Sequence, residues 1–122
     1  MAKYANPLAL DAALAVVAGA TRLVVTAGQP TSVAAANAAR LAETSLIPGD
    51  FTLADGENGG RRLIVAGKAG LMALANGTAD HVALIDDAAA RLLHVTICHP
   101  QPLLAGTALS VQGWEFALGA PV

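Results

Sequence analysis

The chain has 122 residues, of which 55% are hydrophobic and 13% charged, and its formal net charge is −2. Its seven lysines and arginines are scattered, and only Arg61 and Arg62 are adjacent. Nucleic acids and anionic membranes are both bound by clustered basic residues, so the sequence predicts neither as a partner.

The charged fraction is low, about half of the roughly 25% that is typical of globular domains. A surface with so few charges favours burial against other chains, so we expect a homo-oligomer or a larger assembly. The alternative is an alanine-rich sequence in which alanine occupies exposed positions without a partner.

One compact domain over residues 1–122 is expected, because the length suits a single hydrophobic core. The first 22 residues do not resemble a secretory signal, since Asp11 interrupts their apolar part. No apolar run reaches the roughly 18 residues of a membrane span. The single cysteine, Cys98, cannot form an internal disulfide, which indicates either synthesis in a reducing compartment or indifference to redox state.

Residues 7–18 predict a short N-terminal helix. Asn6 is a good N-cap, Pro7 suits the first helical position, and Gly19 is expected to end the helix in a left-handed conformation. With about three turns, such a helix needs tertiary packing for stability.

The chain then predicts a β-domain over residues 22–118, with about seven short strands. The strands are expected at residues 22–27, 41–47, 51–55, 61–66, 81–85, 91–98 and 107–118, and residues 71–77 (LMALANG) favour a further strand over a helix. Residues 29–40 are ambiguous, because Thr31 or Ser32 can cap a short helix while the alanines also suit a surface loop. Residues 99–106 (HPQPLLAG) predict a proline-interrupted loop, and Gly113 a bulge beside Trp114. Short strands at this spacing predict an antiparallel β-sandwich or barrel.

No sequence motif indicates a catalytic or metal-binding site. In the strand at 91–98, alternation places Leu92, His94, Thr96 and Cys98 on one face and Leu93, Val95 and Ile97 on the other. His94 and Cys98 are then about 13 Å apart, at roughly 3.3 Å per residue. They are too distant to share a zinc ion. A pair of Cys98 and His99 with a distant third ligand is left as the alternative.

The acidic residues lead to the same conclusion. Asp86 and Asp87 are adjacent in a short link and are read as a solvated turn rather than a carboxylate pair for acid–base catalysis. The segment DGENGG brings Asp55, Glu57 and Asn58 close together, but it lacks EF-hand spacing and is read as a hairpin turn. We therefore predict no catalytic, cofactor-binding or metal-binding residues, and no enzyme activity.

The order of several segments resembles a group of small virion proteins of tailed bacteriophages. The resemblance rests on residues 6–14 (NPLALDAAL), 29–30 (QP), 49–70 (GDFTLADGENGGRRLIVAGKAG), 77–96 (GTADHVALIDDAAARLLHVT) and 103–118 (LLAGTALSVQGWEFAL). It covers nearly the whole chain, and its motifs are turns and core positions. Residues 71–77 and the link at 96–104 depart from the pattern.

The resemblance implies a structural virion component with no catalytic residues. The first expectation is a capsid decoration or head-surface protein that is made in the bacterial cytoplasm and packs between copies, as a trimer or another symmetric cluster. Its partners would be the major capsid protein or tail proteins. A tail-associated protein (fibre, collar or tail tip) is the alternative. A host-cell adhesin or carbohydrate-binding module would need exposed aromatic residues, which the chain scarcely has.

Overall fold

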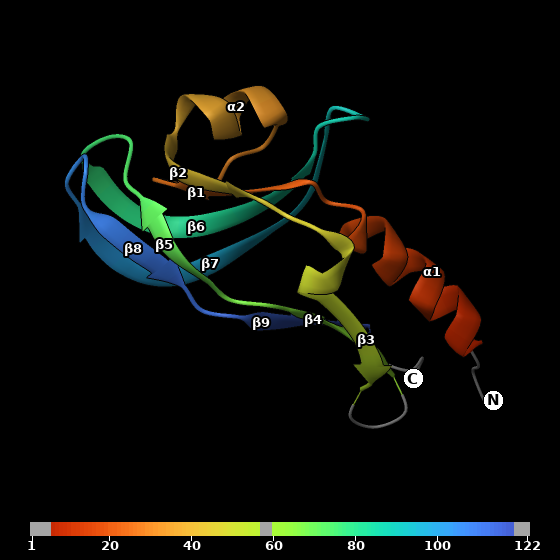
Figure 1. The fold of residues 1–122 in the computed structure, drawn as a ribbon. Helices are drawn as coiled ribbons and strands as arrows, with labels where there is room; N and C mark the ends of the chain where they lie inside the picture. The colour runs from red at the N-terminus through yellow and green to blue at the C-terminus, as the bar shows by residue number, and fades with distance from the viewer. Residues whose placement is uncertain (1–5, 57–59, 119–122) are drawn as a thin grey trace.

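A computed structural model describes residues 6–56 and 60–118, and within them the chain is mainly β with antiparallel sheets and a short N-terminal helix (Figure 1). The predicted fold class is thus confirmed. The elements are α1 (Pro7–Ala18), β1 (Arg22–Thr26), α2 (Val33–Ala38), β2 (Arg40–Ser45), the 3₁₀ turn η1 (Pro48–Asp50), β3 (Phe51–Asp55), β4 (Arg61–Val65), β5 (Lys68–Met72), β6 (Gly77–Asp86), β7 (Arg91–Leu103), β8 (Ala108–Val111) and β9 (Trp114–Leu118).

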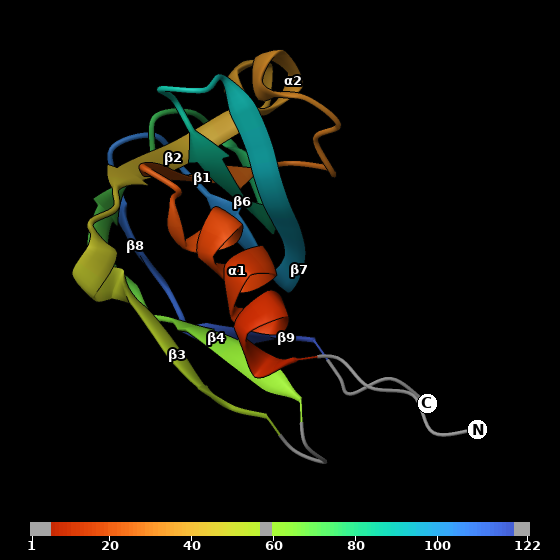
Figure 2. The ribbon, with the colours of Figure 1, turned by 90° about the vertical axis from the view of Figure 1, so that its right-hand side faces the viewer.

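Helix α1 has the predicted bounds, but Gly19 ends it at a φ of −79°, so the predicted left-handed conformation is wrong. The Asn6 side chain accepts a hydrogen bond from the Leu8 N–H at 2.8 Å, which caps the first turn. Leu14 and Val17 are buried in the main core. Asp11 pairs with Arg61 at 2.7 Å and so ties the helix to β4. The helix runs from the four-stranded sheet down to β4 and β9 (Figure 2).

The four-stranded sheet has the order β2-β1-β6-β7 and is buried on both faces in its middle. Leu23 lies opposite Leu84 in this sheet, and both contribute to the main core. On the other face, Val24 and Ile85 pack with Ala36 of α2. The Ser32 hydroxyl caps α2 by accepting from the Ala35 N–H at 3.0 Å. Of the two readings of residues 29–40, the short helix is therefore the one observed.

The remaining strands form a bent two-stranded ribbon with β3 at its edge. β4 pairs with β9 and β5 pairs with β8, so the chain runs up one side of the ribbon and back down the other. At the bend, a Cβ added to Gly113 would lie 2.7 Å from the Val65 carbonyl oxygen, and one added to Gly67 would lie 2.9 Å from the Gly113 nitrogen. The strand predicted over residues 107–118 is thus two strands, separated by Gln112 and Gly113.

The strands wrap around one main core without closing. The Leu74 N–H donates to the Leu41 carbonyl at 2.7 Å, which connects the chain after β5 to β2. On the opposite side, β7 and β8 are terminal strands of their sheets and are not paired with each other. The described residues thus form nine strands and no closed barrel, so the prediction of about seven strands is too low and the barrel alternative is wrong.

Two local predictions also fail. The loop predicted at residues 99–106 is strand as far as Leu103, because Pro100 and Pro102 lie in β7, which has a neighbouring strand on one side only. The strand predicted at 71–77 ends at Met72. After it, the chain turns toward β2, and the buried Ala73 exchanges backbone hydrogen bonds with Thr107 and Gly106.

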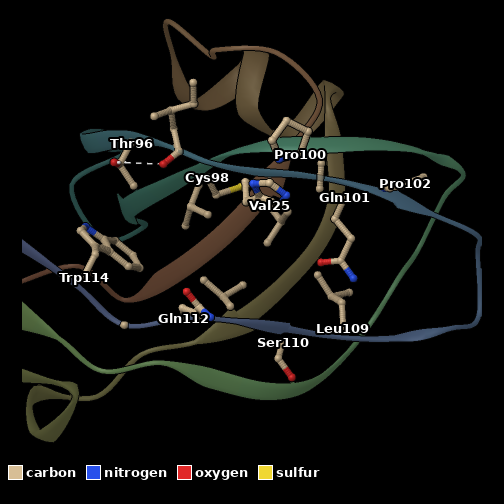
Figure 3. Close-up of a pocket in the computed structure, with 16 residues that line it drawn as sticks. Val25, Thr96, Cys98, Pro100, Gln101, Pro102, Leu109, Ser110, Gln112 and Trp114 are labelled. Carbon is tan, nitrogen blue, oxygen red and sulfur yellow. Dashed lines mark hydrogen bonds between the residues drawn. The ribbon is translucent and has the colours of Figure 1, made fainter.

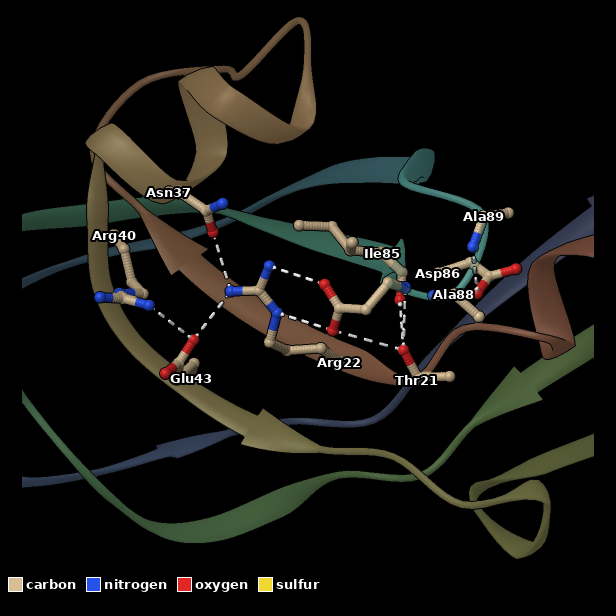
Figure 4. A network of polar contacts seen from close by, with 10 residues as sticks. Thr21, Arg22, Asn37, Arg40, Glu43, Ile85, Asp86, Ala88 and Ala89 are labelled. Carbon is tan, nitrogen blue, oxygen red and sulfur yellow. Dashed lines mark hydrogen bonds and ion pairs between the residues drawn. The ribbon is translucent and has the colours of Figure 1, made fainter.

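A polar network fastens the outer face of the four-stranded sheet (Figure 4). Arg22 of β1 donates to Glu43 of β2 at 2.9 Å and to the Asn37 side chain of α2 at 2.8 Å. Arg22 also pairs with Asp87, in the turn after β6, at 3.1 Å. The hydrogen bond from Arg22 and a further one from Arg40 hold the pKa of the Glu43 carboxyl below its ordinary value. One guanidinium therefore connects β1, β2, α2 and the turn after β6.

We predict that Gly113→Ala lowers the free energy of unfolding by about 1–3 kcal/mol, because the new methyl group would overlap the Val65 carbonyl at the bend. Gly49→Ala is the matched control, since its added Cβ would lie 3.8 Å from the Ile47 side chain, an ordinary contact. Urea unfolding of both variants tests this. Equal stability of the two variants would show that the bend tolerates a side chain.

Candidate binding groove between β7 and β8

The residues considered as zinc ligands do not come together. Among the described residues, no three histidine, cysteine, aspartate or glutamate side chains are close enough to hold a metal ion. His94 points into the core, Cys98 lies on the wall of a groove, and His99 is exposed. Burial, with a smaller effect of the Asp80 charge, raises the pKa of the Cys98 thiol. At neutral pH this thiol is protonated, which makes it a weak nucleophile.

The acidic turns have structural contacts. The Asp86 carboxylate accepts a hydrogen bond from the Ala88 N–H at 3.1 Å, which forms a local turn. Asp87 is half exposed but is held by Arg22 and by Thr21, so it is more than a solvated residue. Asp55 pairs with Arg61. The other two residues considered for calcium, Glu57 and Asn58, lie outside the described residues.

Two irregularities change the faces of β7. Leu84 lies opposite His94 while Ile85 lies opposite Leu92, so Leu93 is an extra residue in β7. As a result, Leu93 packs on the main core and Leu92 packs on the cluster under α2. The predicted faces are therefore wrong for these two leucines. A second irregularity lies between Ile97 and Gln101.

His94 joins the four-stranded sheet to β9. Its ring lies 4.6 Å from that of Phe116 and is stacked at 6.4 Å on that of Trp114, measured between ring centres. The His94 Nε2 and Trp114 Nε1 atoms are buried, and neither has a hydrogen-bond partner among the described residues. Burial lowers the pKa of His94. The half-buried, neutral imidazole thus packs as an aromatic ring against β9.

Beyond this aromatic contact, β7 and β8 lie apart and leave a groove of about 700 Å³ between them (Figure 3). Residues 96–102 of β7 form one wall, and residues 109–114 at β8 and the start of β9 form the other. The floor consists of Val25, Ala79 and Val82, all buried in the core. In Figure 3, Gln101 extends from β7 toward β8, and Leu109 extends from β8 toward β7.

The groove is almost free of charge. The described residues that line it include no lysine, arginine, aspartate or glutamate, and they include one histidine, His99. Its polar side chains are neutral, and they include Thr96, Gln101 and Gln112. Such a lining suits a ligand with neutral hydrogen-bonding groups beside apolar ones. It offers phosphate groups no lysine or arginine to bind.

Sequence reasoning missed this groove because it assigned residues 99–106 to a loop. The spacing of Pro100 and Pro102 contained the missing signal. Prolines two residues apart have their nitrogens on the same side of a strand, so both can face away from a single neighbouring strand. That pattern is typical of an edge strand as well as of a loop.

Comparison with known proteins gives no match for the chain among protein-family models, curated proteins or solved structures. Within the described part of the chain, no helix is long and apolar enough to cross a membrane.

In the unfolded chain His94 has the ordinary histidine pKa of about 6.5, and in the folded chain its pKa is lower. We predict that the free energy of unfolding falls as the pH is lowered from the first of these pKa values toward the second. In this range the unfolded chain takes up the proton more readily than the folded chain, so acid favours unfolding. His94→Phe keeps an aromatic ring and should remove this part of the pH dependence. Urea unfolding between about pH 7.5 and 5 tests this, above the range in which carboxylates with ordinary or lowered pKa values titrate. An unchanged pH dependence in the variant would contradict it.

Proposed function

We propose that this chain is a structural component of a tailed-bacteriophage virion, a capsid decoration or head-surface protein that stabilises the particle by packing between copies. The described parts of the segments that resemble such proteins include most strands of the fold. The described residues of 49–56 and 60–70 run from η1 to β5, residues 77–96 cover β6 and the first part of β7, and residues 103–118 run from the end of β7 to β9. The similarity thus concerns the scaffold rather than a reactive site.

The outer face of α1 is the observation that carries the proposal. Leu8 is 76% exposed and Val16 57% exposed, and the alanines beside them on this face are exposed too. Asp11, the one charged residue of α1, turns inward to Arg61. No described element covers the side of α1 that faces the viewer in Figure 2. A helix that is apolar all round is normally buried, so this face is suited to a partner.

A decoration protein stabilises a shell by removing such surface from water at many equivalent sites. Full burial of one leucine or valine side chain contributes about 1.5–3 kcal/mol. A standard interface buries about 1,600 Å² in total, more than one short helix supplies, so α1 would form part of a larger contact. Its small alanine side chains allow a close approach of the partner.

We predict that Leu8→Glu with Val16→Glu reduces incorporation of the chain into virions at least about tenfold, because two carboxylates would lose hydration in the contact. Both positions are exposed, and glutamate favours helix, so the fold should persist. The control is Leu104→Glu, at a leucine that is 65% exposed after β7. Virions from cells that have each variant as their sole source of the chain would be compared by quantitative gel analysis. Equal incorporation of all variants would exclude α1 as the contact face.

Electron microscopy of virions with a labelled chain tests the location separately. We expect the label on the head surface at many symmetric positions. Label on the tail alone would favour the tail-associated alternative, and absence from purified particles would contradict the virion proposal as a whole.

A further inference from the structure

We infer that the groove between β7 and β8 binds an extended, uncharged polypeptide segment of a partner protein, which enters as an added β-strand. Each wall is a strand with a neighbour on one side only, β6 for β7 and β5 for β8, among the strands that the structure describes. Such edges present N–H and C=O groups that can pair with another chain. A strand placed between them would face a hydrogen-bonding edge on each side, along β8 and along residues 96–98 of β7, before the two prolines.

The dimensions of the groove suit a short strand. Residues 96–102 and 109–114 form walls roughly 17–20 Å long, at about 3.3 Å per residue. This length corresponds to about six residues of an extended segment. The volume of about 700 Å³ is in the range of pockets that hold ligands.

The chemistry of the lining selects an uncharged segment. A charged side chain entering the groove would lose hydration, and the lining residues that the structure describes include no lysine, arginine, aspartate or glutamate to pair with it. Neutral side chains lose much less. Thr96, Gln101 and Gln112 can hydrogen bond with them near the walls, and the aliphatic floor of Val25 and Val82 can receive small apolar side chains.

The prolines of β7 argue against a second copy of this strand as the occupant. Pro100 and Pro102 have no N–H to donate, and a proline within a sheet is tolerated where its nitrogen faces away from the neighbouring strand. A second β7 lying antiparallel to the first would have the same gap in its donors. A different segment can instead take its hydrogen bonds from residues 96–98 and from β8.

This inference goes beyond the virion proposal and does not depend on it. In a virion, the segment would come from a neighbouring shell or tail subunit. The groove can be tested with the purified chain alone, so a failure of one proposal does not affect the other.

The test uses a displayed library of linear seven-residue peptides, selected on the purified full chain. We expect enriched peptides to be uncharged and to bind in a 1:1 ratio. Gln101→Glu with Gln112→Glu should weaken them about tenfold or more, because both changes place a carboxylate on the groove wall. Gln29→Glu is the matched control, since it makes the same exchange at an exposed residue that does not line the groove, and binding should be unchanged. Urea unfolding verifies that each variant is folded.

The binding mode is then read from the backbone and from Cys98. With an enriched peptide bound, amide hydrogen exchange should slow in residues 96–98 and 109–111, and alkylation of the Cys98 thiol should slow as well. The inference is overturned if no peptide is enriched or if enriched peptides are highly charged. Binding that ignores the glutamate changes, or that leaves amide exchange unaltered, also overturns it. Peptide competition with self-association of the chain would identify a second copy as the occupant and overturn it equally.

Discussion

The close approach of Gly67 and Gly113 determines how this chain encloses its core. With no side chain at either position, the ribbon of β4–β5 and β8–β9 can bend, and its β5–β8 half lies over the inner face of β6 and β7 (Figure 1). The hydrogen bond from Leu74 to Leu41 joins this half to β2. The bend and this junction together leave the opposite side open, so the groove between β7 and β8 is a consequence of the backbone geometry.

The aromatic contact of His94 limits how far this opening extends. Its stacking on Trp114 and its tilted contact with Phe116 join β7 to β9 at one end, where the buried Nε2 atom has no hydrogen-bond partner among the described residues. Farther along, β7 has extra residues between Ile97 and Gln101, a stretch that includes Pro100 and is followed by Pro102. The edge is therefore accessible over a short stretch, which restricts the strands that can pair with it.

Local sequence signals predicted the fold where the interaction was itself local. Asn6, Pro7 and Gly19 identified the bounds of α1, and Ser32 identified one of the two readings of residues 29–40 correctly. The failures depend on distant neighbours. The extra residue at Leu93 is visible only against β6, and the strand character of Pro100 and Pro102 depends on having a neighbour on one side alone. The groove could not be predicted, because it lies between segments whose separation is set by the glycine bend.

The few charged residues explain why the two proposed surfaces are uncharged. Arg22 forms ion pairs with Glu43 and Asp87, Arg61 forms ion pairs with Asp11 and Asp55, and Lys68 pairs with Asp50. These pairs hold strands, turns and α1 to one another. Few charges are then left for the outer face of α1 and for the groove walls. Because removing uncharged, apolar surface from water is favourable, these two faces fit the contacts proposed for them better than they fit recognition of a charged ligand.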